Sequence, residues 1–362
     1  MATVLVRVKT LIAAFVVVLL AVSAAFGLAV SPAFAATAAE RAALAQWWAP
    51  VHFQDVDTTG NTSLAGKSDY LSSYDFDGDL NGRNNWENTS QYPLAAHVYY
   101  SVVQTSGFTY LVYMFFHPRD WSDGSLSDYE ADLSEHENDS EGVLVIVKND
   151  GTTYGKLEAA ITVAHKDFYS YVPSGSDFSS GAEDIDGLLA TTTDPHDADQ
   201  HQRPWTAAQS KSHAAWSYGA TRAPSPALQT QYKSGDGVLY YPGSTAEVPS
   251  NANDRDVQYT LTDIFAPGGM RDNRTNTSLF ATTSAFAGDS SSNPYGAKCG
   301  AGAVSTSCDT NSANPPWAWD DQNDLPGSGA IATDPSYLVW DYFSWSGRPS
   351  TAESYTYNPY QS

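Results

Sequence analysis

The sequence is poor in cysteine and in basic side chains, and both shortages narrow the classes of protein that it can encode. Two cysteines in 362 residues argue against a disulfide-rich scaffold. A zinc site at these cysteines is also not expected, because no histidine lies near them in the sequence. Lysine and arginine number 18 against 41 acidic residues, without a basic cluster that could neutralise phosphates. We therefore expect no nucleic acid partner, whereas such a surface attracts divalent cations. The sequence also lacks a nucleophile elbow, a phosphate-binding loop and a cysteine–histidine pair.

Long hydrophobic runs are confined to the N-terminus. Two basic residues precede an uncharged apolar stretch from Leu11 to Val30, and Ala33-Phe34-Ala35 fits a small-residue cleavage site. We predict that residues 1–35 are a secretory signal peptide and that the exported, extracellular chain starts at Ala36. An uncleaved membrane anchor is the alternative, because the apolar stretch is long enough to span a bilayer.

The remainder, residues 36–362, shows no internal repeat and no low-complexity linker, so we predict one domain and a monomer. Cys299 and Cys308 enclose a loop of glycine, alanine, serine and threonine. In an exported protein, such a pair predicts one disulfide that fastens a surface loop.

The pattern of apolar and turn residues predicts an all-β protein, an elaborated β-sandwich or jelly-roll-like fold with a short N-terminal helix and long loops. Residues 38–48 are alanine-rich and predict the helix, which Pro50 closes. Beyond it, Tyr, Trp, Thr and Val dominate and turn residues recur at short intervals. We expect one hairpin of strands 96–103 and 108–116 and a second of strands 143–148 and 154–163. A short strand is expected at 237–241, and a strand or helix at each of 257–265 and 337–345. Loops are expected at 173–212 and 288–316.

The run His136-Glu137-Asn138-Asp139-Ser140-Glu141 directly precedes Gly142 and an apolar stretch, where a loop becomes a strand. A rigid sheet can hold functional groups at such a point. Asp139 and Glu141 are two residues apart and project from one face if the strand has already begun. One imidazole with two carboxylates suits a divalent cation. The alternative is an acidic surface loop with an incidental histidine.

A second acidic group follows the apolar run 110–116, which ends in His117-Pro118-Arg119-Asp120. If this strand pairs with residues 143–147, Asp120 lies at the same end of the sandwich as Glu141. Alternatively, Asp120 is a partner of Arg119 or a turn cap. The loop that follows contains four acidic residues that could compete as a fourth ligand: Asp123, Asp128, Glu130 and Asp132.

The segment from Tyr113 to Asp120 and the His136-x-x-Asp139-x-Glu141 motif resemble two elements of the necrosis- and ethylene-inducing-peptide-like cytolysins. That resemblance implies a metal-binding sandwich that damages membranes, with a divalent cation held by Asp120, His136, Asp139 and Glu141. Ser140 replaces the tryptophan of the family motif, Asn138 replaces its second histidine, and the spacer before His136 is longer. The motif is also similar to the His-x-Gly-Asp-Trp-Glu sequence of a vacuolar-sorting-associated family.

Two later histidines extend these resemblances. Residues 162–165 are similar to the strand end of the cytolysins that faces the cation, and residues 211–215 are similar to a Ser-His-Ala element of the vacuolar-sorting family. His165, His213 and Glu137 are therefore candidates for orienting a ligand or for general acid–base catalysis. Each histidine could instead be a buried side chain satisfied by one backbone carbonyl.

Two further segments carry candidate binding residues. Asp75, Asp77 and Asp79 resemble a calcium loop and predict a second cation site, with solvated Asx turns as the alternative. Trp317 and Trp319 stand beside two carboxylates. Exposed, they suit carbohydrate stacking or a membrane surface, and buried, they are aromatic anchors.

Together these features predict a secreted protein that binds a divalent cation and recognises a glycan or glycolipid head group at a target surface. Oxygen-rich ligation favours Ca²⁺ or Mg²⁺, while the histidine leaves Mn²⁺ or Zn²⁺ open. One rival is a metal-dependent hydrolase. The other is a non-catalytic extracellular protein that calcium stabilises, for which a closed coordination shell would argue.

Overall fold

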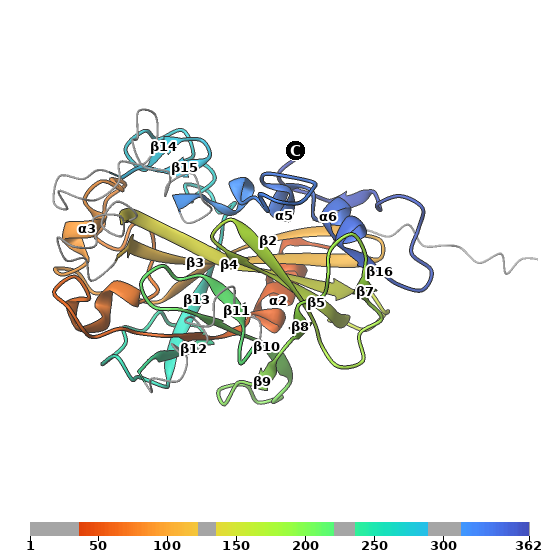
Figure 1. The fold of residues 1–362 in the computed structure, drawn as a ribbon, viewed down its shortest axis with the longest axis horizontal. Coiled ribbons are helices and arrows are strands. Elements are labelled where there is room, and N and C mark those ends of the chain that lie inside the picture. The colour runs from red at the N-terminus through yellow and green to blue at the C-terminus, as the bar shows by residue number, and fades with distance from the viewer. Residues whose placement is uncertain (1–35, 122–134, 221–235, 289–312, 362) are drawn as a thin grey trace, which may run out of the picture. The chain divides into compact units, whose positions relative to one another are not determined.

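A 13-stranded mixed sheet organises the described part of the chain, which in this computed structural model comprises residues 36–121, 135–220, 236–288 and 313–361 (Figure 1). The all-β prediction is thus confirmed. These residues belong to one compact unit, Ala35–Ser362. The predicted signal peptide, the predicted disulfide of Cys299 with Cys308 and the acidic residues between 122 and 134 lie outside the described residues. Within the described ranges, no helix has the length and apolar character needed to cross a membrane.

Short strands and a few short helices surround four long strands. The helices are α2 (Ala38–Trp48), η1 (Leu64–Asp69), α3 (Asn85–Asn88), η5 (Pro316–Ala318), α5 (Ala330–Thr333) and α6 (Pro335–Tyr342). The strands are β1 (Val51–Gln54), β2 (His97–Thr105), β3 (Phe108–Asp120), β4 (His136–Lys148), β5 (Lys156–Ala164), β6 (Asp167–Val172), β7 (Ser179–Ser180), β8 (Gly187–Leu188), β9 (Thr191–Thr193), β10 (Gln202–Ala208), β11 (Ala215–Ser217), β12 (Val238–Pro242), β13 (Val257–Asp263), β14 (Phe280–Thr282), β15 (Ala285–Phe286), β16 (Phe343–Ser344) and β17 (Tyr355–Tyr357).

The sheet joins an antiparallel meander to strands from distant parts of the chain. Its order is β11-β10-β1-β12-β13-β2-β3-β4-β5-β6-β8, with β17 beside β2 and β9 beside β10. Strands β2 to β6 are consecutive and antiparallel, whereas β1–β10, β12–β13 and β13–β2 pair in parallel. Because β11 packs against β5, the sheet curls back toward its own face.

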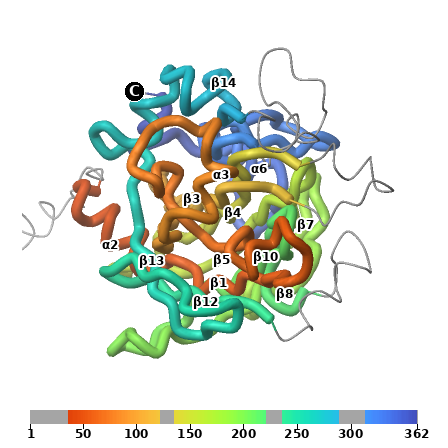
Figure 2. Tube along the Cα trace, turned by 90° about the vertical axis from the view of Figure 1, so that its left-hand side faces the viewer, coloured from red at the N-terminus to blue at the C-terminus, as the bar shows by residue number. Residues whose placement is uncertain are grey.

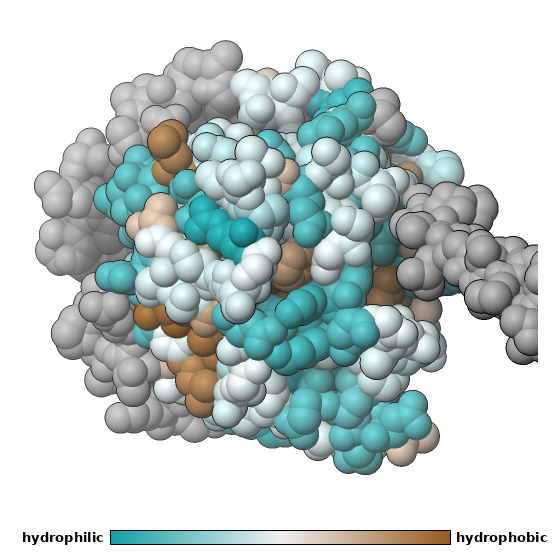
Figure 3. All heavy atoms as spheres, turned by 90° about the vertical axis from the view of Figure 1, so that its right-hand side faces the viewer, coloured by the Kyte–Doolittle hydropathy of each residue, from teal (hydrophilic) through white to brown (hydrophobic). Residues whose placement is uncertain are grey.

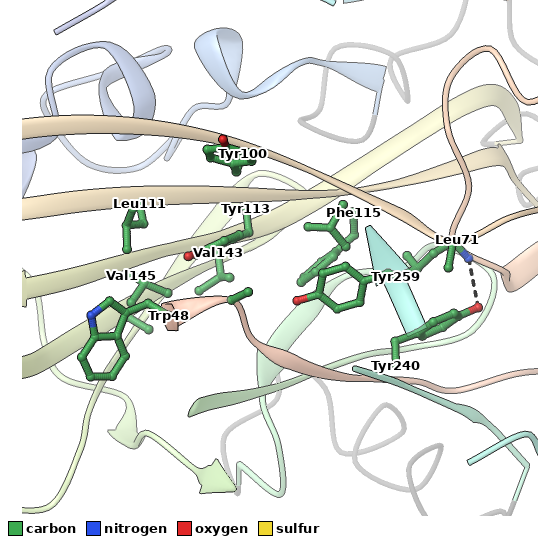
Figure 4. Close-up of a cluster of buried hydrophobic side chains, with 14 of the residues drawn as sticks. Trp48, Leu71, Tyr100, Leu111, Tyr113, Phe115, Val143, Val145, Tyr240 and Tyr259 are labelled. Carbon is green, nitrogen blue, oxygen red and sulfur yellow. Dashed lines mark hydrogen bonds between the residues drawn. The ribbon is translucent and has the colours of Figure 1, made fainter. Parts of the chain in front are cut away.

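Alternate side chains of the long strands enter two hydrophobic cores. Val143 and Val145 of β4 face one core, which Tyr240 and Tyr259 close from the other half of the curled sheet (Figure 4). Leu144 and Ile146 face the second core, which contains side chains of α5, α6 and the β14–β15 hairpin. In Figures 1 and 2, the C-terminal segment accordingly lies on one side of β3 and β4, and β12 and β13 lie on the other.

Local sequence signals located most of these elements. Helix α2 has the predicted bounds, and Thr37 and Glu40 form a capping box at its start. Both predicted hairpins are present, but β4 begins at His136 and so includes the whole acidic run. The segment 173–212 was wrongly predicted as a loop throughout, since it contains β10. That strand is stabilised by parallel pairing with β1, a partner about 150 residues away that no local pattern reveals.

Hydrophilic side chains dominate the face shown in Figure 3, and only a few hydrophobic ones reach the surface there. Five large apolar side chains among the described residues are exposed: Tyr92, Leu188, Val248, Leu325 and Tyr337. The acidic surface predicted from composition is compatible with this distribution.

Candidate metal centre

The acidic run lies inside the sheet, at the end where β3 finishes and β4 starts. In the antiparallel register, Asp120 pairs with His136, His117 with Asp139, and Phe115 with Glu141. The predicted convergence of Asp120 with the run is therefore present. His136, Asp139 and Glu141 are at most 1% exposed, which contradicts the alternative of an acidic surface loop.

Asn138 explains how His136 and Asp139 face the same space. Residues three apart in a regular strand point to opposite faces of the sheet. Asn138 has a φ of 62°, a left-handed conformation that interrupts this alternation. Its buried amide donates to the carbonyl oxygens of Gly82 (2.6 Å) and Ala287 (2.5 Å) and accepts from Asn85 (2.5 Å). Two separate segments, residues 82–85 and the end of the β14–β15 hairpin at Ala287, thus hold the bend between the two side chains.

Asp120, His136 and Asp139 form a compact donor group, because one ligand atom from each lies within 4.8 Å of the others. His136 Nδ1 lies 3.1 Å from the carbonyl oxygen of Glu137, which fixes this nitrogen as the donor. Its Nε2 then carries a lone pair, lies 3.7 Å from Asp120 Oδ2 and has no hydrogen-bond partner among the described residues. Burial lowers the pKa of His136, which favours the neutral ring. A bare nitrogen facing a carboxylate oxygen suits a shared cation.

Glu141 is not a member of either compact donor group of the described residues, but its carboxylate lies beside Asp139. Both of its oxygens are buried without a hydrogen-bond partner in the described part of the chain, as is Asp139 Oδ1. Burial, together with the charges of Asp139 and Asp120, raises the pKa of Glu141 well above its usual range. Burial and the charge of Asp139 likewise raise the pKa of Asp120. Buried carboxylates that repel one another require protons or a cation for neutralisation.

His213 holds the other oxygen of Asp139. Its Nδ1 donates to Asp139 Oδ2 at 2.5 Å and its Nε2 donates to Asp69 Oδ1 at 3.2 Å. Burial alone lowers the pKa of His213, but the hydrogen bonds to these two carboxylates outweigh it and raise the pKa to about 9. The charged ring therefore fixes Asp139 so that Oδ1 remains available to another partner.

A second group, His117 with Asp139 and His213, is equally compact but has the wrong geometry for one ion. The rings of His117 and His213 are stacked 3.7 Å apart at 5°, so an ion in the plane of one ring lies outside the plane of the other. Moreover, both nitrogens of His213 are engaged with carboxylates. His117 donates from Nε2 to Gln54 Oε1 at 3.0 Å, and burial lowers its pKa well below the usual value.

The three candidates for acid–base roles occupy different surroundings. Glu137 is 1% exposed and accepts a hydrogen bond from the backbone N–H of Trp86. His213 is fully buried between its two carboxylates. The side chain of His165 is 34% exposed, with Nδ1 3.6 Å from Glu141 Oε1. Among these candidates, only His165 combines access to solvent with proximity to the cluster.

The calcium-loop segment lies apart from this cluster. Asp77 accepts from Asn88 and from the backbone of Asp79, and Asp79 accepts from Asn84 and from the backbone of Asn81. These are the Asx turns of the alternative interpretation. A cation at Asp75, Asp77 and Asp79 stays a prediction, and the compact donor groups of the described residues do not include them.

The tryptophan pair is divided between the core and the surface. Trp319 is fully buried and donates to the carbonyl oxygen of Asn314. Trp317 is half-buried, donates to Thr283 and packs against the guanidinium of Arg271, which lies 4.6 Å from the ring centroid. Trp319 is thus an aromatic anchor, and only Trp317 reaches the surface.

Sequence motifs did not reveal every residue of the cluster. Asp69 accepts from Trp121 Nε1, Lys211 N and His213 Nε2, yet it comes from η1, where no motif marks it. His117 precedes Asp120 by three residues and could have been identified as a strand residue on the inner face. These contributions depend on contacts between distant segments.

Comparison with known proteins found similar solved structures, all at low sequence identity. No protein-family model matches the sequence, and no curated protein matches it. The chain is similar to a solved structure of the non-toxic HaNLP3 protein (11% identity, 61% of this chain and 74% of that chain, TM-score 0.28). It is also similar to Necrosis and Ethylene inducing Protein 2 from the causal agent of cocoa's Witches Broom disease (16% identity, 46% of this chain and 50% of that chain, TM-score 0.21). A third similar structure is NLPPya in complex with glucosamine (13% identity, 63% of this chain and 76% of that chain, TM-score 0.28).

These structures are of necrosis- and ethylene-inducing proteins, the family that the His136 motif resembles. TM-scores of this size carry no argument about the fold or activity of the chain. The similarity to the vacuolar-sorting-associated family stays a prediction. What the fold and the cluster define is a class: an all-β protein with buried carboxylates and histidines gathered at one end of its central strands.

Proposed function

We propose that the chain binds one divalent cation through Asp120, His136, Asp139 and Glu141, and uses it to recognise a glycan or glycolipid head group outside the cell. The observation that supports the site most directly is the set of buried polar atoms without hydrogen-bond partners in the described residues: His136 Nε2, Asp139 Oδ1 and both oxygens of Glu141. Native proteins rarely bury such atoms unsatisfied. Three carboxylates and one imidazole suit Ca²⁺, Mg²⁺ or Mn²⁺.

The residues around these ligands have separate tasks in this proposal. Glu137 O holds the ring of His136 so that Nε2 points toward Asp120, and His213 holds Asp139. Such supporting contacts set the orientation and basicity of metal ligands. The cation supplies a positive charge to which sugar hydroxyls can bind. His165, about one-third exposed beside Glu141, is where a polar ligand could reach the cluster.

The glycan or glycolipid class comes from the resemblance of the His136 motif to the cytolysins, and export comes from the N-terminal sequence. NLPPya has been solved in complex with glucosamine and with mannosamine, which are ligands of that protein. A membrane-damaging activity is the further expectation from the motif. Residues 36–362 would carry out the recognition step in either case.

Calorimetric titration with Ca²⁺, Mg²⁺, Mn²⁺ and Zn²⁺ tests the site. Glu141→Gln keeps the size of the side chain but removes its charge, so we expect binding of the preferred ion to weaken at least tenfold. Glu158→Gln is the matched control: Glu158 is also fully buried but accepts hydrogen bonds from Ser176 and Asp177 outside the cluster. Unchanged affinity of the Glu141 variant for all four ions would overturn the proposal.

Recognition is tested separately, with glycolipid-bearing vesicles and a glycan array. Binding should be lost on chelation and in Glu141→Gln, and should persist in Glu158→Gln. Binding that survives chelation would transfer recognition away from the cluster, with Trp317 as the next candidate. Time-dependent release of a product that His165→Gln abolishes would favour the hydrolase instead, because His165 is the accessible acid–base group.

A further inference from the structure

His117 is a fully buried histidine that the proposed cation site does not use, although it lies directly beside that site. It is the cross-strand partner of Asp139 in the β3–β4 register. Its ring also packs face to face on the ring of His213, with 3.7 Å between the centroids and 5° between the planes. His117 therefore contacts the residue that donates to Asp139 without being one of the proposed ligands.

Gln54, the last residue of β1, determines which nitrogen of His117 carries a proton. Its amide nitrogen Nε2 donates to the carbonyl oxygens of Asp55 and Gln209, at 3.0 Å in each case, which assigns the orientation of the amide. Its Oε1 must therefore accept the 3.0 Å hydrogen bond from His117 Nε2. A further proton on His117 Nδ1 would find no acceptor among the described residues, so the ring is neutral.

A neutral ring suits this stack because the ring of His213 is charged. His213 donates from both nitrogens, to Asp139 and to Asp69, and is therefore an imidazolium. The face of a neutral aromatic ring attracts a cation that lies over it, and the attraction is stronger where water is excluded. Two imidazolium rings at the same separation would repel one another. The hydrogen bond to Gln54 thus gives His117 the form that stabilises the stack.

The backbone around His213 explains why its ring requires support. His213 has a φ of 51° and Lys211 a φ of 76°, both in the left-handed region that residues other than glycine rarely adopt. Such conformations persist where the surroundings enforce them. Gln54 contributes to this on both sides, because its Nε2 donates to Gln209 at the base of the turn that carries His213 and its Oε1 holds His117. One side chain thus fixes both the turn and the ring against which His213 packs.

We propose that His117, oriented by Gln54, is a positioning residue of the cation site, a role that rests on the proposed function. The face of the His117 ring sets the plane of the His213 ring. That plane directs His213 Nδ1 at Asp139 Oδ2, so Asp139 Oδ1 stays turned toward the cation. His117 itself makes no contact with the ion.

Calorimetric titration of the full chain with Mn²⁺ compares two substitutions of His117. His117→Leu removes the ring and should weaken Mn²⁺ binding by about tenfold, a typical effect of losing a contact that orients a metal ligand. His117→Phe restores a neutral aromatic face and should stay within about threefold of the wild type, although it cannot donate to Gln54. His52→Leu is the matched control, and should leave the affinity unchanged. His52 is also fully buried and stacked, but on Phe115 at 3.9 Å, and its Nδ1 lies 2.9 Å from the hydroxyl of Thr206.

Proton NMR in EDTA gives a second readout that does not involve the ion. The proton of the short, charge-assisted hydrogen bond from His213 Nδ1 to Asp139 should give a signal far downfield of the other N–H signals. This signal should remain in His117→Phe and His52→Leu. It should broaden or vanish in His117→Leu, because a ring that can turn away exposes its proton to exchange with water. Gln54→Met is a second variant in case His117→Leu does not fold, and should weaken Mn²⁺ binding by about three- to tenfold.

The outcomes separate the role of His117 from the cation site itself. A downfield signal that survives His117→Leu, or equal losses of Mn²⁺ affinity in His117→Leu and His52→Leu, would overturn the positioning role. Equal losses in His117→Leu and His117→Phe would show that the ring face does not hold His213, and would overturn it as well. A wild type that binds none of Ca²⁺, Mg²⁺, Mn²⁺ and Zn²⁺ would instead overturn the proposed function.

Discussion

His213 donates a 2.5 Å hydrogen bond from Nδ1 to Oδ2 of Asp139, and both side chains are fully buried. Because Nε2 of the same ring donates to Asp69, the imidazole is held as a cation between two carboxylates. This arrangement makes Asp139 part of the internal structure as well as a candidate ligand. The effects of mutations at the cluster follow from that double role.

We predict that Asp139→Ala abolishes cation binding and also lowers the free energy of unfolding by about 3 kcal/mol or more, because it leaves a buried imidazolium with one partner. Asp139→Asn should bind the cation poorly but lose less stability, since its amide oxygen still accepts from His213. Urea denaturation in EDTA measures the stability of both variants. Wild-type stability of the alanine variant would contradict this account of the pair.

Asp69→Asn should weaken cation binding by about 10- to 100-fold although Asp69 is not a proposed ligand. The substitution removes one of the charges that raise the pKa of His213, so the ring holds Asp139 less firmly. Calorimetric titration with Mn²⁺ gives the affinity, and NMR titration of His213 should show a lowered pKa. Asp177→Asn, at an exposed ion pair, serves as control and should change neither quantity.

Cation binding at pH 6 should release protons. The pKa values of Asp120 and Glu141 are raised by burial and by neighbouring carboxylates, so these groups stay protonated at a pH where free carboxyls are ionised. Calorimetry in buffers of different ionisation enthalpy counts the protons. A proton count of zero in the wild type, or the same count in Glu141→Gln, would contradict the prediction.

The same raised pKa values set the pH dependence of the cation-free protein. Protonated Asp120 and Glu141 contribute fully to the free energy of unfolding below about pH 4. This contribution is lost as pH rises through their raised pKa values, because the folded state then loses protons that it binds more tightly than the unfolded chain does. The free energy of unfolding also falls as pH rises through about 9, the raised pKa of His213, because the ring then loses its charge between the two carboxylates. In EDTA, unfolding free energy should therefore fall with pH more steeply in the wild type than in Glu141→Gln.

Asn138 offers a test of backbone geometry. Asn138→Gly keeps the left-handed conformation at φ 62° but removes three buried hydrogen bonds. Asn138→Ala removes the same bonds and adds conformational strain, so it should be about 1 kcal/mol less stable than the glycine variant. Thermal denaturation of the two variants measures the difference. Equal stability would indicate that the bend at Asn138 is not held by its surroundings.

Local patterns in the sequence were sufficient for the central meander and the main candidate ligands. The helix 38–48, the two hairpins and the alternation of Val143 to Val147 depend on neighbours in the chain, and all are present. The run beginning at His136 was recognisable because histidine and acidic residues directly preceded an apolar strand. The complete burial of this run could not be recognised from the sequence, because apolar neighbours alone do not show that charged residues also lie inside a sheet.

Long-range contacts were beyond those patterns. Asp69 and His213 are separated by 144 positions and meet because η1 packs against β3 and the turn before β11 is hydrogen-bonded to Trp121 at the end of β3. Similarly, β10 contains Pro204, a residue that strands disfavour, yet residues 202–204 pair with β9 and residues 205–208 pair with β1, with β11 on the other side. Such positions become interpretable only when the partner segment is known.

The placement of β1 has a consequence for biosynthesis. Its two neighbours, β10 and β12, come from residues 202–208 and 238–242, so β1 has neither sheet partner until about 150 later residues have been synthesised. The β2–β5 meander, in contrast, can pair as soon as each hairpin emerges. Closure of the curled sheet must therefore be a late event with a large loop entropy cost. Until then, β1 stays without either of its strand partners, whereas the meander beside it is already paired.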